Sequence, residues 1–143
     1  YHRYEISNYA KAGYVCRHNV GYWKRVDYIG FGLGASTLQN PLRYKNTDDL
    51  QEYLNLDFSK NELLVLTKDN QIEETLFLGL RMMEGVSLSA FEEHFHCPLT
   101  VIYQREIQKL TEKGLLRMEE DRIFLTEKGI DLSNMVLSEF LLG

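Results

Sequence analysis

The sequence predicts an α+β fold, because its two ends differ in texture. Residues 1–46 combine short apolar runs with aromatic side chains and glycines, which is typical of strands and loops. From residue 73 onward, apolar residues recur at helical spacing, and one pair of short alternating runs interrupts them. We therefore expect a strand-and-loop part at 1–46, a connecting segment at 47–72 and a helical part at 73–143.

Composition limits the class of protein. The chain has 143 residues, of which 44% are hydrophobic and 26% are charged, enough for one domain or two small ones with a working core. No apolar run approaches the roughly 20 residues of a membrane span, and the first residues lack the order of a signal peptide, so a cytoplasmic protein is expected. Because Tyr1 is not a methionine, and Ile6 lies in a run suited to a buried strand that exits at Ser7, we expect a fragment of a longer chain.

The connecting segment carries one clear helix signal. The run TDDLQEYLNL begins with Thr47 as a candidate N-cap, and it has acids in the first turn and apolar residues at helical spacing. The following SKNELLVLTKDN is short and ambiguous between a strand and a helix. The segment therefore predicts one short helix, followed by one element that could be a strand or a helix.

The helical part predicts four helices and a hairpin. The first runs from Gln71 to a stop at Gly85, and the second follows a cap at Ser87 or Ser89. A third is expected over 100–114, a hairpin over 115–126, and a last helix after a cap at Thr126. Three helices, a hairpin and a closing helix make a winged-helix arrangement.

Charge argues against the use for which a winged helix is best known, which is reading DNA. From Glu73 to the end there are seven basic and thirteen acidic side chains, a net charge of −6, and the hairpin tip is Glu119-Glu120-Asp121. Affinity for phosphates comes mainly from lysine and arginine. We therefore expect no nucleic-acid partner, and a packing or partner-binding module is preferred.

A run of alternating glycines is one candidate ligand contact. Gly30, Gly32 and Gly34 follow a β-prone pair, and missing side chains let a ligand approach the backbone closely. The spacing is not GxGxxG, so a tight turn is an equally good interpretation.

The stretch CRHNVGYW is the second candidate. His18 could bind iron or transfer a proton, and Cys16 could be a thiolate ligand. Tyr22 and Trp23 offer a planar surface for a large flat ligand. The alternatives are a hydrogen-bonded structural histidine, a reduced thiol and aromatic side chains at a domain interface.

The remaining histidines and cysteines argue against a metal site and a disulfide framework. His94 and His96 would point to different sides of a helix and make a poor metal pair. Cys16 and Cys97 are far apart and form no CxxC pair, so neither a disulfide framework nor a zinc knuckle is indicated. No catalytic triad order, phosphate loop or HExxH is present, and no catalytic residue is predicted within the chain.

Taken in order, these stretches resemble one known family. YEISNYAKAGYVCRHNVGYWKRVDYIGFGLGAST resembles the C-terminal side of the catalytic barrel in the oxygen-independent coproporphyrinogen III oxidase-like proteins, a family of radical S-adenosylmethionine proteins. HNVGYW is similar to the HNxxYW motif of the branch regarded as haem chaperones. The tail, with LRMMEGVSLSAFEEHF, LTEKGLL and LTEKGIDLSNMVLSEFL, resembles the C-terminal domain of that family.

The resemblance implies the last strands and loops of a radical S-adenosylmethionine barrel followed by a winged-helix-like domain. The parent would bind a 4Fe-4S cluster through CxxxCxxC and use S-adenosylmethionine. That motif is absent here, so the fragment itself is expected to retain no cofactor and to be inactive alone. The resemblance implies contacts to S-adenosylmethionine at Gly32, Gly34 and Ser36, although Ser36 stands where haem-chaperone relatives usually have histidine.

The resemblance also implies a haem contact at His18, a possible haem ligand, with Asn19, Tyr22 and Trp23 orienting it or covering the haem. A structural role, locking the last barrel strands to the C-terminal domain, is the rival interpretation. Implied partners are haem and a haem-acceptor protein, a membrane-associated acceptor among them, and the oligomeric state is open. Two other functions stay in view: a true coproporphyrinogen III oxidase of porphyrin biosynthesis, and an acidic winged-helix interaction module.

Overall fold

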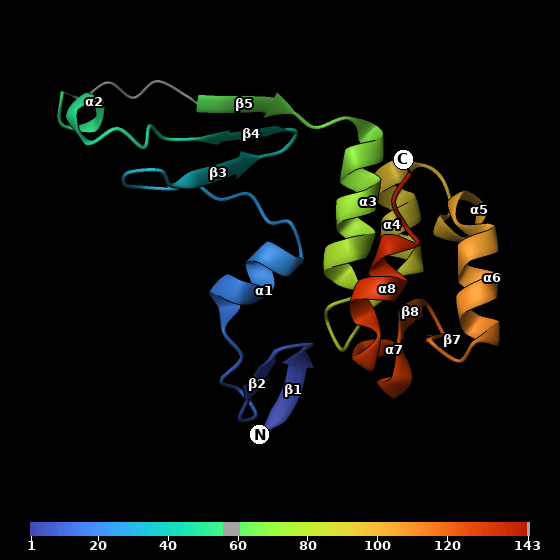
Figure 1. The fold of residues 1–143 in the computed structure, drawn as a ribbon. Helices are drawn as coiled ribbons and strands as arrows, with labels where there is room; N and C mark the ends of the chain where they lie inside the picture. The colour runs from blue at the N-terminus through green and yellow to red at the C-terminus, as the bar shows by residue number, and fades with distance from the viewer. Residues whose placement is uncertain (56–60, 143) are drawn as a thin grey trace. The chain divides into compact units, whose positions relative to one another are not determined.

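The computed structural model describes residues 1–55 and 61–142, which contain eight helices and eight strands (Figure 1). They form two compact units. The first joins two separate segments of the chain, Tyr1–Lys24 and Ile72–Gly143, and the second is Arg25–Gln71. The predicted domains 1–46, 47–72 and 73–143 are drawn from changes in residue composition along the sequence. They stay a prediction, since the two compact units have other boundaries.

The larger segment of the first unit surrounds one hydrophobic core. Its elements are α3 (Lys68–Gly79), β6 (Val86–Ser87), α4 (Leu88–Phe95), α5 (Leu99–Ile102), α6 (Gln104–Glu112), β7 (Leu116–Glu119), β8 (Arg122–Leu125), α7 (Glu127–Asp131) and α8 (Ser133–Ser138). The strands form an antiparallel sheet in the order β6-β8-β7. Leucines at 76, 80, 110 and 137 are fully buried, so α3, α6 and α8 share this core with the sheet.

Two predicted helix starts and the hairpin are confirmed. Ser87 is the N-cap of α4, where its Oγ accepts a hydrogen bond from the Ala90 N–H at 3.1 Å. Thr126 caps α7 in the same way, with the Gly129 N–H at 3.0 Å. The alternating runs predicted as a hairpin are β7 and β8, which pair from Leu116 with Leu125 onward. Side-chain caps are local signals, and tertiary packing left them unchanged here.

Three predicted helices differ in extent. The first ends at Gly79 instead of Gly85, because the next residues turn away to bond with the start of the chain: Arg81 C=O accepts from the Ile6 N–H, and the Met83 N–H donates to Tyr4 C=O. The helix expected over 100–114 breaks at Tyr103, whose buried ring packs edge-on against Phe140. The last helix breaks between α7 and α8.

The start of the chain forms a two-stranded hairpin. Strands β1 (His2–Glu5) and β2 (Asn8–Ala10) are antiparallel, and Ile6 lies in the turn between them and packs against the core. The strand predicted here therefore ends earlier than its sequence suggests, and the expected exit at Ser7 leads directly into a second strand. Helix α1 (Arg17–Trp23) follows in the same unit.

The second unit is a three-stranded antiparallel sheet in the order β3-β4-β5 with one short helix (Figure 1). Its elements are β3 (Ser36–Gln39), β4 (Leu42–Lys45), α2 (Leu50–Leu54) and β5 (Asn61–Val65). The predicted helix is present, but its cap is Asp49, while the buried Thr47 accepts from the Asp49 N–H and donates to Glu52. In the ambiguous run, 61–65 is a strand and α3 begins at Lys68, while 59–60 lie outside the described residues. None of the helices in the described ranges is long and apolar enough to span a bilayer.

Candidate functional site

Helix α1 carries the HNVGYW stretch on a scaffold with little stability of its own. It has seven residues, its N-cap Cys16 makes no side-chain capping bond, and none of its residues is buried. Isolated helices of this length are unstable in water. The position of α1 therefore depends on the few side chains that attach it to the rest of the unit.

One side of α1 presents an imidazole and a phenol to solvent. His18 and Tyr22 are one helical turn apart, and their ring centroids are 4.7 Å apart in an edge-to-face arrangement. Both are exposed, Tyr22 by 39%, whereas Asn19 beside them is half-buried. An exposed imidazole held against an aromatic ring can offer a ring nitrogen to a metal. The structure thus brings His18 and Tyr22 together.

Trp23, the last residue of the stretch, contacts the body of the unit. Its indole ring lies 4.7 Å from the guanidinium of Arg81, and its Nε1 is buried with no hydrogen-bond partner among the described residues. A guanidinium over an indole face is a favourable cation–π contact. Trp23 is therefore placed as an anchor of α1, and it does not share the exposed side that carries His18 and Tyr22.

A buried ion pair lies behind this anchor. Glu5, fully buried, accepts from Arg81 through two nitrogens at 2.7 and 2.9 Å, from the Ser7 N–H at 2.9 Å and from Asn8 Nδ2 at 2.6 Å. Burial opposes ionisation of this carboxyl, but the hydrogen bonds from Ser7, Asn8 and Arg81 outweigh it and hold its pKa below the usual range. Sequence reasoning missed both members of the pair. The available signal was an arginine directly after the buried Leu80 of a helical apolar stripe.

The glycine run is a tightly bonded loop in the second unit. Asn46 Nδ2 donates to the carbonyls of Gly30 at 3.2 Å and Gly32 at 2.9 Å, and Thr37 Oγ1 accepts from the Gly30 N–H at 3.0 Å. The Gly34 N–H donates to the Thr47 carbonyl. These bonds fix the loop from both ends, so its backbone has a single defined path.

Two of the predicted contact glycines need the backbone freedom of that residue. Gly32 has φ +105° with open space where a Cβ would be, and Gly34 has φ +64°. Ser36 is the first residue of β3, opposite Lys45. Phe31, between the glycines, is 89% exposed. The loop therefore offers an open backbone face at Gly32 beside a projecting aromatic ring. It belongs to a different compact unit from α1.

The donor set does not fit an iron–sulfur cluster. Among the described residues no group of three or more His, Cys, Asp or Glu side chains could hold a metal ion. Cys16 and Cys97 are both free thiols, one exposed and one half-buried. His94 lies on α4, and His96 is its left-handed C-cap at φ 56°. Two thiols do not make the three-thiolate ligand set implied by CxxxCxxC.

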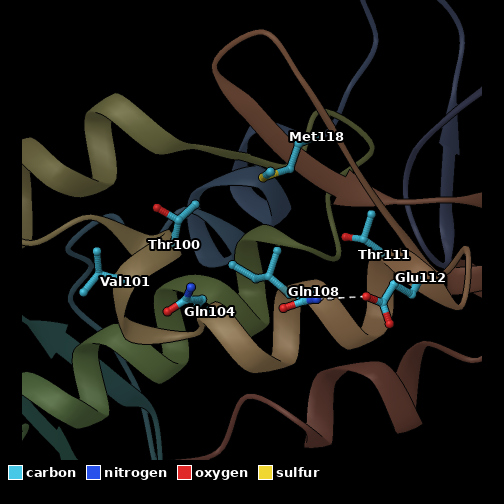
Figure 2. Close-up of a pocket in the computed structure, with 8 residues that line it drawn as sticks. Thr100, Val101, Gln104, Gln108, Thr111, Glu112 and Met118 are labelled. Atoms are coloured by element: carbon cyan, nitrogen blue, oxygen red, sulfur yellow. Dashed lines mark hydrogen bonds between the residues drawn. The ribbon is translucent and has the colours of Figure 1, made fainter.

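A shallow groove of about 520 Å³ lies elsewhere on the first unit, between α5, α6 and β7 (Figure 2). Its lining is neutral except for Glu112, which accepts a hydrogen bond from Gln108 at 2.9 Å. The lining residues are Thr100, Val101, Gln104, Ile107, Gln108, Thr111, Glu112 and Met118. None of the predicted site residues lines the groove, and neither lysine nor arginine does.

Comparison with known proteins gives the family context. Residues 66–132 match the family model of the HemN C-terminal domain. The chain is 39% identical to "Heme chaperone HemW" of Lactococcus lactis over 99% of its length, and 38% identical to "Heme chaperone HemW" of Bacillus subtilis over 98%. In both cases the chain spans 38% of the relative's length.

A solved structure supports the fold. The coproporphyrinogen III oxidase (HemN) from Escherichia coli, described as a radical SAM enzyme, superposes with a TM-score of 0.65 over 81% of this chain and 28% of its own, at 20% sequence identity. At that identity the likeness concerns the fold alone. The mixed helix and sheet arrangement is therefore one that a radical SAM enzyme also contains.

The HemN C-terminal domain match and the relatives named heme chaperone HemW carry the resemblance to the coproporphyrinogen III oxidase-like proteins that the sequence predicts. The family resemblance predicted from the sequence is confirmed. The chain is similar along its length to proteins named heme chaperone HemW.

Proposed function

We propose that this chain is the C-terminal portion of a haem chaperone of the radical S-adenosylmethionine class, which holds haem for transfer to an acceptor protein. The observation that carries the proposal is the exposed His18–Tyr22 pair on α1, within a chain similar along its length to proteins named heme chaperone. The parent protein is proposed to be cytoplasmic, and a membrane-associated acceptor fits the same proposal.

His18 supplies the chemistry of haem contact. Its exposed imidazole binds the haem iron through a ring nitrogen, and the edge contact with Tyr22 restricts the orientation of the ring. Tyr22 covers one side of the bound haem, and Asn19 orients the histidine from the adjacent position. Trp23 contributes by holding α1 in place, because it faces Arg81. An exposed ligand suits a carrier, since the cargo must leave as well as bind.

The glycine loop is proposed as one wall of an S-adenosylmethionine pocket, with contacts at Gly32, Gly34 and Ser36. The open space beside Gly32 fits a ligand that approaches the backbone closely. When bound together with a 4Fe-4S cluster held by another part of the parent, S-adenosylmethionine supplies radical chemistry. The loop contributes a fixed backbone surface whose shape Asn46 maintains.

The helical part is proposed as a winged-helix module for contact with other protein surfaces. The order α3, β6, α4, α5–α6, β7, β8 supports this assignment. Its hairpin tip is acidic and its groove contains no cationic lining residue, which disfavours a nucleic-acid partner. On this proposal 1–46 is the end of the catalytic barrel, 47–72 is a connecting segment, and 73–143 is the C-terminal domain.

Haem titration tests the proposal. Haemin added to the chain, and to the longer protein that contains it, should produce a saturable Soret shift that weakens at least about tenfold in affinity in His18→Ala. His94→Ala is a matched control, because His94 is also exposed on a helix and meets an aromatic ring edge-on, Phe95 at 4.5 Å. Equal weakening by both variants, or by neither, would remove His18 from the site.

The rival enzyme function has its own test. A true coproporphyrinogen III oxidase would decarboxylate two propionates of coproporphyrinogen III, and the longer protein should then form protoporphyrinogen under anaerobic conditions with S-adenosylmethionine and a reductant. We expect no such product from a haem chaperone, while haem binding persists.

A further inference from the structure

We infer that Arg81 is a positioning residue for the proposed haem contact: it pairs with the buried Glu5 carboxylate and contacts the Trp23 ring, and in this way it sets the orientation in which α1 presents His18. This inference rests on the proposed function and extends it, because it assigns a role at the haem site to a residue of the C-terminal part of the chain. Arg81 lies within the stretch LRMMEGVSLSAFEEHF, whose family resemblance assigns no role to it.

Arg81 is itself held rigidly. Its guanidinium forms two charge-assisted hydrogen bonds to the carboxylate of Glu5, at 2.7 and 2.9 Å, and its side chain is only 20% exposed. Glu5 is fixed in turn by Ser7 and Asn8 within the N-terminal hairpin. Nε and Nη2 both approach the same carboxylate oxygen, Oε1, which restricts how the guanidinium can turn. The guanidinium carbon lies over the Trp23 indole ring, 4.7 Å from its centroid.

The backbone around Arg81 is fixed as well. The Arg81 carbonyl accepts from the Ile6 N–H at 3.0 Å, and the Met83 N–H donates to the Tyr4 carbonyl at 3.1 Å. This segment therefore acts as an extra strand edge for β1. Arg81 thus joins the N-terminal hairpin to the turn after α3, two parts of one compact unit that are far apart in sequence.

Helix α1 has little support of its own. None of its residues is buried, and its N-cap is unsupported by a side chain. After Trp23, Lys24 forms an ion pair with Glu84 at 2.7 Å, but both side chains are about half exposed and such pairs hold a helix weakly. Of these two contacts, the Trp23–Arg81 contact is the one made by a residue of α1 itself and by a partner that is mostly buried. His18 and Tyr22 lie on another side of the same helix, so a change at the stack turns them.

Trp23 is the sole tryptophan of the chain, and its emission reports the stack directly. The experiment uses the 143-residue chain in five forms: wild type, Arg81→Ala, Arg81→Lys, Trp23→Leu and the control Arg105→Ala, in which an exposed arginine of α6 is removed. Trp23→Leu breaks the stack but leaves the Glu5–Arg81 pair intact, so it is the variant to use if Arg81→Ala fails to fold. Far-UV circular dichroism reports folding.

Arg81→Ala should red-shift Trp23 emission and raise its acrylamide quenching, and Arg105→Ala should change neither. In haemin titrations, Arg81→Ala and Trp23→Leu should each weaken binding about fivefold to tenfold, with a changed Soret position. Arg81→Lys should restore folding but only part of the affinity, because an ammonium keeps the ion pair and loses the planar stack.

The outcomes separate the two proposals. A wild-type chain and parent protein that bind no haemin refute the proposed function. Haemin binding that is equal in wild type, Arg81→Ala and Trp23→Leu overturns the positioning role and leaves the proposed function standing. Unchanged quenching of Trp23 in a folded Arg81→Ala chain also overturns it, because the clamp would then be absent in solution.

Discussion

Asp121 and Ser89 tie the tip of the β7–β8 hairpin to the start of α4. One carboxylate oxygen of Asp121 accepts from the Ser89 N–H at 2.9 Å, and the other accepts from Ser89 Oγ at 2.7 Å and Ser87 Oγ at 2.6 Å. The Asp121 carbonyl also accepts from the Leu88 N–H at 2.8 Å. The first turn of α4 thus has two caps: Ser87, the residue directly before the helix, and Asp121, from the tip of the β7–β8 hairpin.

Replacing Asp121 should loosen this junction. We expect Asp121→Ala to lower the urea midpoint of the first unit, because the first turn of α4 loses three hydrogen bonds to one carboxylate. Glu119→Ala is the control: its partner Arg117 is exposed, and such pairs contribute little. Urea unfolding followed by Trp23 emission measures both. Equal midpoints for the two variants would show that the second cap is not needed.

The same carboxylate predicts a dependence on pH. Hydrogen bonds from Ser87 and Ser89 lower the pKa of Asp121. A lowered folded-state pKa gives stability that is present above the unfolded-state value, about 3.9, and is lost as the pH falls through the folded-state value. The difference in the free energy of unfolding between wild type and Asp121→Ala should therefore be constant near neutrality and shrink below about pH 4.

Glu5→Gln should be strongly destabilising. The substitution removes one partner of a buried ion pair and leaves the Arg81 guanidinium facing a neutral amide, at a cost of about 3 kcal/mol. Because the pKa of Glu5 is also lowered, this loss should be full above about pH 4.3 and diminish in acid. Urea titrations at neutral and acidic pH measure it. A cost that does not change with pH would show that folding does not lower the pKa of Glu5.

Gly30→Ala should disrupt the glycine loop. A Cβ at this position would lie 2.2 Å from the Ser36 carbonyl oxygen, a backbone atom that cannot move aside, so we expect a loss of about 2–3 kcal/mol in the second unit. Gly32→Ala is the comparison, because it meets no neighbouring atom and carries only the strain of its positive φ, about 1–2 kcal/mol. Hydrogen exchange of peptides from 25–71 reports each loss. The reverse order would contradict the loop geometry.

Leu76→Ala tests the core of the first unit. Leu76 is fully buried on α3, and its truncation should lower the free energy of unfolding by about 3–4 kcal/mol. Leu132→Ala, at a leucine that is 43% exposed, should cost less than about 1 kcal/mol. Thermal and urea unfolding give both values. Similar costs at the two sites would mean that the helices do not close around this core.

The acidic helical part should not bind duplex DNA at physiological salt. Fluorescence anisotropy with a labelled duplex should stay flat for the chain. Reversing the hairpin tip with Glu119→Lys and Glu120→Lys should introduce weak, salt-sensitive binding, since cations at this point face phosphates with the favourable sign. Saturable binding by the wild-type chain would overturn the partner-binding interpretation of this part.

Local signals made much of the fold predictable. The caps at Ser87 and Thr126, the hairpin after Gly114 and the helix before Asn55 follow from side chains that act on neighbouring backbone groups. The lengths of the helices were less accessible. Whether a helix continues past Gly79 depends on Tyr4 and on other residues more than seventy positions away, which compete for its backbone.

The candidate site was predictable as a stretch but not as an arrangement. HNVGYW could be singled out because its composition is unusual and resembles a family motif. That His18 and Tyr22 share an exposed side follows from helical spacing, once α1 is known to be a helix. The clamp formed by Glu5, Arg81 and Trp23 depends on three segments meeting in space, and no spacing within one segment encodes that meeting.

The first unit is assembled from both ends of the chain, and topologically this makes Arg25–Gln71 an insertion into a host. The entropic cost of closing such an excursion grows only slowly with its length. The first unit should therefore tolerate a longer, shorter or exchanged segment between Lys24 and Ile72, provided that the β1–β2 hairpin still pairs with Arg81 through Glu5. The glycine loop lies within this insertion, whereas the histidine helix α1 lies in the host unit.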